Sequence, residues 1–99
     1  MTTDRVLLEL AAKAARYQYA KHGGYIVVDG IPGNWNPLSD DGDALRLAVK
    51  LEIDLRFGCG GLSAHGLAMD IEEDYGRDRC AATRRAIVRA AAEIGKAMK

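Results

Sequence analysis

Hydrophobic positions recur at helical spacing in three segments of the chain. From about Asp4 to His22, apolar residues form one stripe while charged residues fall on the opposite face. Thr3 or Asp4 can cap the start of this helix, and Gly23-Gly24 can end it in a left-handed turn. The pattern therefore predicts a first helix over residues 4–22.

The second and third helices are predicted from their caps. Ser39 is a typical N-cap, and the acids that follow it stabilise the positive end of a helix that runs to Leu51. The expected apolar face of this helix consists of Ala44, Leu45, Ala48, Val49 and Leu51. Asp78 is the expected cap of the last helix, which runs to about Met98 and is rich in alanine.

Strands are predicted between these helices. Tyr25–Val28 is short, β-branched and bounded by glycine, whereas Asp29–Asn34 is dense in turn residues. Glu52–Phe57 alternates polar and apolar residues, which is typical of a strand with one wet face. Leu62–Tyr75 fits both alternation and helical spacing; we favour a strand, because Gly58–Gly61 suits a hairpin loop.

Together these elements predict an α+β fold. We expect one domain over residues 1–99, with three helices and a small, mostly antiparallel sheet in a layered α/β/α-type sandwich. No apolar run is long enough to span a membrane, and the first residues lack the basic and apolar regions of a signal peptide. We therefore expect a small soluble domain in the cytoplasm.

Charge is neutral overall but segregated along the chain. Residues 29–76 hold ten acids and three bases, a net of −7, and residues 77–99 hold seven bases and two acids, a net of +5. The simplest interpretation is that the basic last helix packs beside the acidic middle segment. The alternative is that Arg84, Arg85 and Arg89 on this helix contact the phosphates of a nucleic acid.

Two motifs resemble the signatures of a family of short phage and prophage proteins, the phage ABA sandwich domain. The motifs are Trp35–Leu51 and Ala81–Gly95, and the opening Leu7–Ala15 fits the same pattern. The resemblance implies helix layers around a sheet and a cytoplasmic setting in a bacterial host cell. It implies no activity, because the family is uncharacterised. The chain matches the family least over residues 58–78, so we expect any protein-specific function there.

The sequence shows no coherent catalytic or metal-ligating set. His22, His65, Cys59 and Cys80 are the soft metal ligands, and none lies three or four residues from another. Cys59 and His65 suggest a nucleophile pair, but nothing in the sequence orients the histidine. The glycine-rich segment from Gly58 has Ser63 where a dinucleotide fingerprint needs its third glycine. We therefore expect no enzyme, no metal and no cofactor.

The candidate binding residues are few. Trp35 is the only tryptophan, and a role in the core is favoured over an exposed binding role. The other candidates are the three arginines of the last helix. The leading hypothesis is a non-enzymatic accessory protein that binds a host or phage protein. Nucleic-acid binding is the alternative, and the alanine-rich helix could also support a homodimer.

Overall fold

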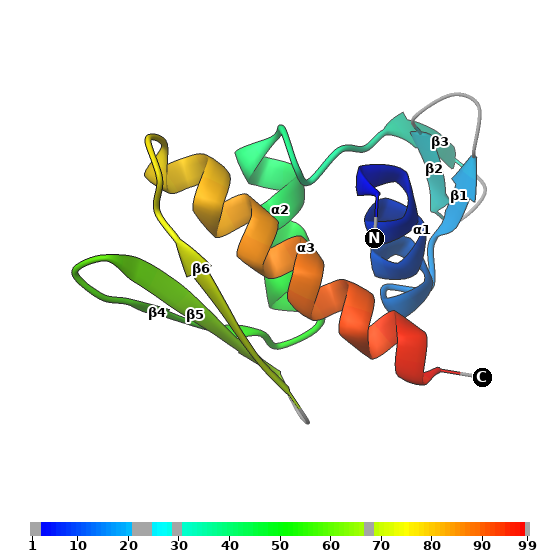
Figure 1. Cartoon of the computed structure of the whole chain (residues 1–99). Helices are drawn as coiled ribbons and strands as arrows, with labels where there is room; N and C mark the ends of the chain where they lie inside the picture. Colours follow the sequence, from blue (N-terminus) through cyan, green and yellow to red (C-terminus); the bar gives the residue numbers. More distant parts are fainter. Residues whose placement is uncertain (1–2, 21–24, 29–30, 67–68, 99) are drawn as a thin grey trace.

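The computed structural model describes residues 3–20, 25–28, 31–66 and 69–98. Within them the chain forms three helices and six strands in the order α1, β1, β2, β3, α2, β4, β5, β6, α3 (Figure 1). Their bounds are α1 Asp4–Ala14, β1 Gln18–Ala20, β2 Tyr25–Val28, β3 Ile31–Asn34, α2 Asp41–Lys50, β4 Asp54–Phe57, β5 Gly61–Gly66, β6 Met69–Asp74 and α3 Arg79–Ala97.

The first helix is shorter than predicted. Thr3 caps it, since its Oγ1 accepts a hydrogen bond from the Val6 N–H at 3.2 Å. The helix ends at Ala14, and Arg16 takes the left-handed conformation with φ 62°. The Tyr17 N–H then donates to the Ala12 carbonyl, which completes a Schellman turn. The prediction of a helix to His22 is wrong, because this turn sends residues 18–20 into strand β1; Gly23-Gly24 lies outside the described residues.

The first sheet has the order β1-β2-β3, and both strand pairs are antiparallel. The predicted strand Tyr25–Val28 is confirmed as β2. The prediction of a turn over Asp29–Asn34 is wrong at Ile31–Asn34, which pairs with β2 as β3. Residues 29 and 30 lie outside the described residues. Pairing with β2 is what overrides the local turn preference of the Pro32-Gly33 pair.

Helix α2 begins one residue later than predicted. Its N-cap is Asp40, whose Oδ2 accepts from the Asp43 N–H at 2.8 Å, rather than Ser39. Ser39 instead donates its hydroxyl proton to the Asn36 carbonyl in the preceding turn. The predicted apolar face is also partly wrong. Ala44, Leu47 and Ala48 are buried, while Leu45 and Val49 are 61% and 69% exposed.

The second sheet has the order β4-β5-β6 and is also antiparallel. A two-residue hairpin joins β4 to β5, and the Gly58 N–H donates to the Gly61 carbonyl at 2.9 Å. Leu62–Tyr75 is confirmed as strand, with most of β5 and all of β6 in this segment, and the helix alternative is wrong. Residues 67 and 68 lie outside the described part of the chain.

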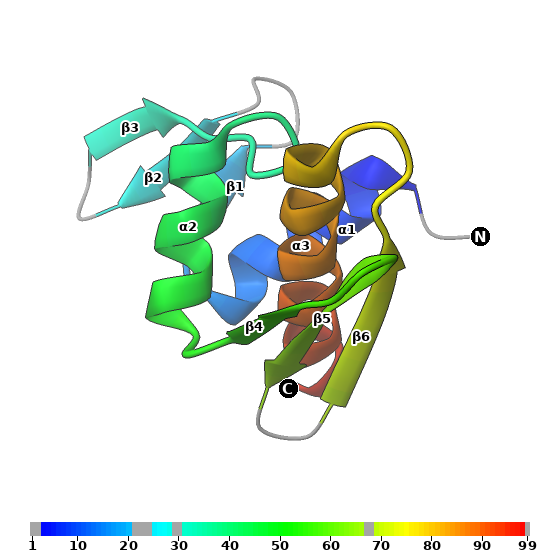
Figure 2. The ribbon, with the colours of Figure 1, turned by 90° about the vertical axis from the view of Figure 1, so that its left-hand side faces the viewer.

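The α+β class, the three helices and the antiparallel strands are confirmed. The strands form two sheets with the helices between them (Figures 1 and 2), rather than the single small sheet between helix layers that we expected. Figures 1 and 2 show the helices between these sheets, with the first sheet beside α1 and the second across α3. Asp78 caps α3 as predicted, by accepting from the Ala81 N–H. None of the described helices combines the length and apolarity that crossing a membrane requires.

The core is built from small side chains at the contact between α1 and α3. Gly95 of α3 lies so close to the backbone of Leu10 that a Cβ atom there would overlap its carbonyl group. Both helices carry fully buried alanines along their length. These alanines are Ala11, Ala12, Ala86, Ala90 and Ala91. Small residues thus allow the two helices to pack closely.

Candidate functional site

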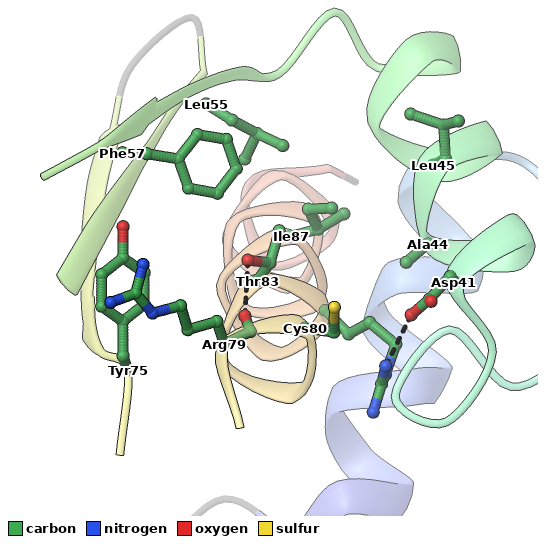
Figure 3. Close-up of a pocket in the computed structure, with 11 residues that line it drawn as sticks. Asp41, Ala44, Leu45, Leu55, Phe57, Tyr75, Arg79, Cys80, Thr83 and Ile87 are labelled. Carbon is green, nitrogen blue, oxygen red and sulfur yellow. Dashed lines mark hydrogen bonds and ion pairs between the residues drawn. The ribbon is translucent and has the colours of Figure 1, made fainter. Parts of the chain in front are cut away.

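An apolar groove of about 570 Å³ lies between α2, β4 and the first half of α3. Figure 3 shows Leu45 of α2 on one side, Leu55 and Phe57 of β4 on the other, and Ile87 of α3 between them. The remaining lining residues stand around the N-terminal turns of α2 and α3. They are Asp41, Ala44, Tyr75, Arg79, Cys80, Thr83 and Arg84.

The groove exists because the sheet extends beyond the helix that covers it. Alternation along β4 places Leu55 and Phe57 on the inner face of the sheet. Helix α3 packs against β5 and β6, so β4 lies at the margin of the helix layer. Phe57 consequently remains 63% exposed, although it occupies an inward position in the pattern. The molecule therefore exposes a large aromatic side chain beside an apolar hollow.

Strand β4 is also an edge strand. It pairs with β5 on one side, and among the described residues no strand pairs with its other side. Gly58 and Gly61 form a hydrogen-bonded pair, so alternation makes Arg56–Ser63 and Asp54–His65 hydrogen-bonded pairs as well. The N–H and C=O groups of Leu55 and Phe57 therefore point away from β5. They lie on the side of β4 where the groove opens.

Several polar groups around the groove have partners among the described residues. The Tyr75 hydroxyl donates to the Gly58 carbonyl at 2.9 Å, and Arg84 binds Asp41 at 2.5 Å. Arg79 lies over the Tyr75 ring, 4.9 Å from its centroid. Among the described residues Arg79 has no carboxylate partner within salt-bridge distance, whereas Arg84 has one. A cation is thus available at one end of an apolar groove.

Trp35 lies in the core and outside this groove. It is 5% exposed, and the rings of Tyr17 and Tyr19 meet it edge-on at centroid distances of 5.9 and 6.0 Å. These contacts join the segment after α1 to the segment before α2. In this position the indole stabilises the packing of the first sheet.

The three candidate arginines of α3 do not form one cluster. Arg84 lines the groove and pairs with Asp41, while Arg85 pairs with Asp4 of α1 at 3.2 Å. Arg89 donates to the Glu73 carboxylate and to the Glu72 carbonyl of β6. Each guanidinium group therefore binds an acid of its own chain. The acidic middle segment supplies two of these acids, as the simpler interpretation of the charge pattern predicted.

A polar row on the outer face of the second sheet was missed by the sequence reasoning. Ser63 Oγ lies 2.8 Å from His65 Nε2, and His65 Nδ1 lies 2.5 Å from Asp70 Oδ1. Asp70 is the cross-strand neighbour of His65, so the hairpin register supplies the group that orients the histidine. The expectation that nothing orients His65 is wrong. The available signal was the spacing of Ser63 and His65, which places both on one face of a strand.

The described residues contain no group of three or more histidine, cysteine, aspartate or glutamate side chains placed to hold a metal ion. Both cysteines are free thiols at the surface. Cys80 lines the apolar groove, and Cys59 lies in the hairpin turn between β4 and β5.

Comparison with protein-family models, with curated proteins and with solved structures found no match to this chain. The resemblance to phage ABA sandwich proteins therefore stays a prediction. The functional argument rests on the groove, the free edge of β4 and the charges beside them.

Proposed function

We propose that this protein is a non-enzymatic accessory protein of phage or prophage origin that binds a host or phage protein in the bacterial cytoplasm. One observation carries the proposal of binding: Phe57 is exposed at an apolar groove, next to the unpaired edge of β4. Large apolar side chains gathered around a hollow are typical of interaction sites. The phage origin rests on the resemblance of the two sequence motifs.

The groove suits an extended segment of a polypeptide. The N–H and C=O groups of Leu55 and Phe57 offer the hydrogen bonds that a further strand requires. Alternate side chains of that strand would enter the apolar groove and cover Phe57 and Ile87. An acidic residue of the segment would pair with Arg79, which has no carboxylate partner among the described residues. The occupant that fits is therefore an apolar segment carrying an acid.

The proposal is tested by affinity capture from infected or lysogenic cells with the wild type and two variants. Phe57→Ser removes the exposed ring from the groove. Val6→Ser is the matched control, because Val6 is 42% exposed on α1 and does not line the groove. We expect a partner that is retained by the wild type and by Val6→Ser and is lost, by about tenfold or more, with Phe57→Ser.

Two results would contradict the proposal. One is a wild type that captures no protein at concentrations well above micromolar. The other is a partner that binds Phe57→Ser as well as it binds the wild type. Thermal unfolding of both variants provides the folding check, and both should remain close to the wild type because these side chains are exposed.

Nucleic-acid binding through α3 has weaker support. A phosphate would have to compete with Asp41, Asp4 and Glu73 for the three arginines. The described structure thus uses the basic helix to neutralise acids of the same chain.

A specific observation favours one second candidate, which is hydrolysis at the Ser63–His65–Asp70 row. These residues have the hydrogen-bond order of a nucleophile, a general base and an orienting acid. Ser63 and Arg56 also line a hollow of about 340 Å³ beside the sheet. In this candidate the Ser63 oxygen attacks an ester carbonyl while its proton passes to His65 Nε2. The ester C–O bond then breaks, and the alcohol leaves with the proton from His65. Water, deprotonated by His65, finally hydrolyses the acyl-serine, which releases the acid and restores the Ser63 hydroxyl.

Hydrolysis of p-nitrophenyl acetate tests this candidate. A turnover that is lost in Ser63→Ala and in Asp70→Asn, but kept in Cys59→Ser, would support it. Hydrolysis that is equal in the wild type and in Ser63→Ala would reject it. In that case the row is a structural network that fixes the register of β5 and β6.

A further inference from the structure

We infer that the free edge of β4 pairs with β4 of a second copy of this chain, antiparallel and about a two-fold axis at Leu55. The inference rests on the part of the proposed function that makes the free edge of β4 a binding site for an extended polypeptide. It follows from the self-complementary order of residues 54–57 and from the direction in which their backbone groups point.

The backbone supports a two-fold axis at Leu55. The N–H and C=O groups of Leu55 point away from β5. Two Leu55 residues placed opposite each other therefore exchange two hydrogen bonds as a closely spaced pair. In this register Phe57 lies opposite Ile53 of the second copy. Only the Phe57 N–H can form a hydrogen bond there, because the Ile53 N–H already donates to the Ala48 carbonyl of its own chain at 2.9 Å.

The charges of β4 are complementary in this register. With Leu55 opposite Leu55, Asp54 lies opposite Arg56 of the second copy, and the symmetry repeats this pair. Asp54 and Arg56 are exposed on the outer face of the sheet. Neither makes an ion pair within the described residues, whose salt bridges lie elsewhere. Opposite charges directly across two antiparallel strands stabilise the pairing.

The apolar face of the new pair is also complementary. Leu55 and Phe57 face inward, so pairing brings two Leu55 side chains together and covers part of the exposed Phe57 ring. Leu45 of α2, which is 61% exposed, lies on the opposite side of the groove into which the added strand enters. The pairing thus buries apolar surface that a single chain leaves in water.

The opposite edge of the sheet lacks this complementarity. Strand β6 carries Asp70, Glu72, Glu73 and Asp74 and no base. Self-pairing of β6 would place acids near acids, which protects that edge from association. Of the two edge strands of this sheet, only β4 has an order of charges that is complementary to itself in antiparallel pairing.

Sedimentation equilibrium from micromolar to millimolar protein concentration tests the inference. We expect the wild type to form a weak dimer. Asp54→Arg and Arg56→Asp, made singly, place like charges opposite each other and should each weaken the dimer by about tenfold or more. The double variant Asp54→Arg with Arg56→Asp restores opposite charges and should dimerise within about threefold of the wild type.

Glu72→Arg is the matched control, because it reverses an exposed charge on the outer face of the other edge strand. It should leave the dimer unchanged. Circular dichroism of each variant verifies the fold. A wild type that stays monomeric at millimolar concentration overturns the inference, as does a dimer that both single variants leave unchanged.

These outcomes are separable from those of the proposed function. A monomeric wild type that still captures a partner through Phe57 would reject the dimer and support heterologous binding. The other outcome is a dimer that the single variants at Asp54 and Arg56 weaken and the double variant restores, with no captured partner. It would support self-association and reject the host or phage partner.

Discussion

At the scale of single residues, several positions act through backbone geometry rather than side-chain chemistry. Arg16 is the clearest case, because it adopts φ 62° in the turn that ends α1. Glycine is the usual residue here, since a Cβ atom is unfavourable in the left-handed region. No glycine marks this turn, so helical periodicity through Tyr17 and Tyr19 extended the predicted helix too far.

Replacing Arg16 should therefore stabilise the protein. We expect Arg16→Gly to raise the free energy of unfolding by about 0.5–1 kcal/mol, because glycine relieves the strain of the left-handed conformation. Lys13→Gly is the control inside α1, and it should destabilise by about 1 kcal/mol. Urea unfolding measures both. A destabilised Arg16→Gly variant would show that the turn is not strained.

At the scale of helices and strands, tertiary packing decided which apolar residues of α2 became buried. Leu45 and Val49 fit an amphipathic face of α2, yet Leu47 is buried in their place. The reason is that α2 contacts α3 along one stripe, while Leu45 faces the open groove. The strand pattern was a better guide. Alternation predicted a strand over Glu52–Phe57, and Asp54–Phe57 forms β4, whereas Glu52 takes the left-handed conformation with φ 54°. Strands β5 and β6 pair along their whole length.

The contact between α1 and α3 gives a second stability prediction. Gly95→Val should destabilise by about 3 kcal/mol or more, because its side chain would overlap the Leu10 backbone and force the helices apart. Gly33→Ala is the control, since a Cβ atom there meets nothing within 4 Å. Thermal unfolding compares the two variants. Equal stability of Gly95→Val and the wild type would contradict the close approach of the helices.

At the scale of the whole molecule, the segregated charge of the sequence becomes a set of contacts between distant segments. Arg84 joins α3 to α2, Arg85 joins it to α1, and Arg89 joins it to β6. The basic helix lies centrally and its arginines meet acids on three sides. The candidate site also belongs to this scale, because the groove needs α2, β4 and α3 in place together.

The sequence by itself determined the local features: the caps at Thr3 and Asp78, the β2 strand and the alternation of β4. It also determined the opposite net charges of residues 29–76 and residues 77–99. These depend on residues close together in the chain, where capping and periodicity act directly. Tertiary structure alone decided which face of α2 is buried, that the strands divide into two sheets, and that Asp70 meets His65. It also left Phe57 exposed. Each of these depends on pairing and packing between segments far apart in sequence, which no local pattern encodes.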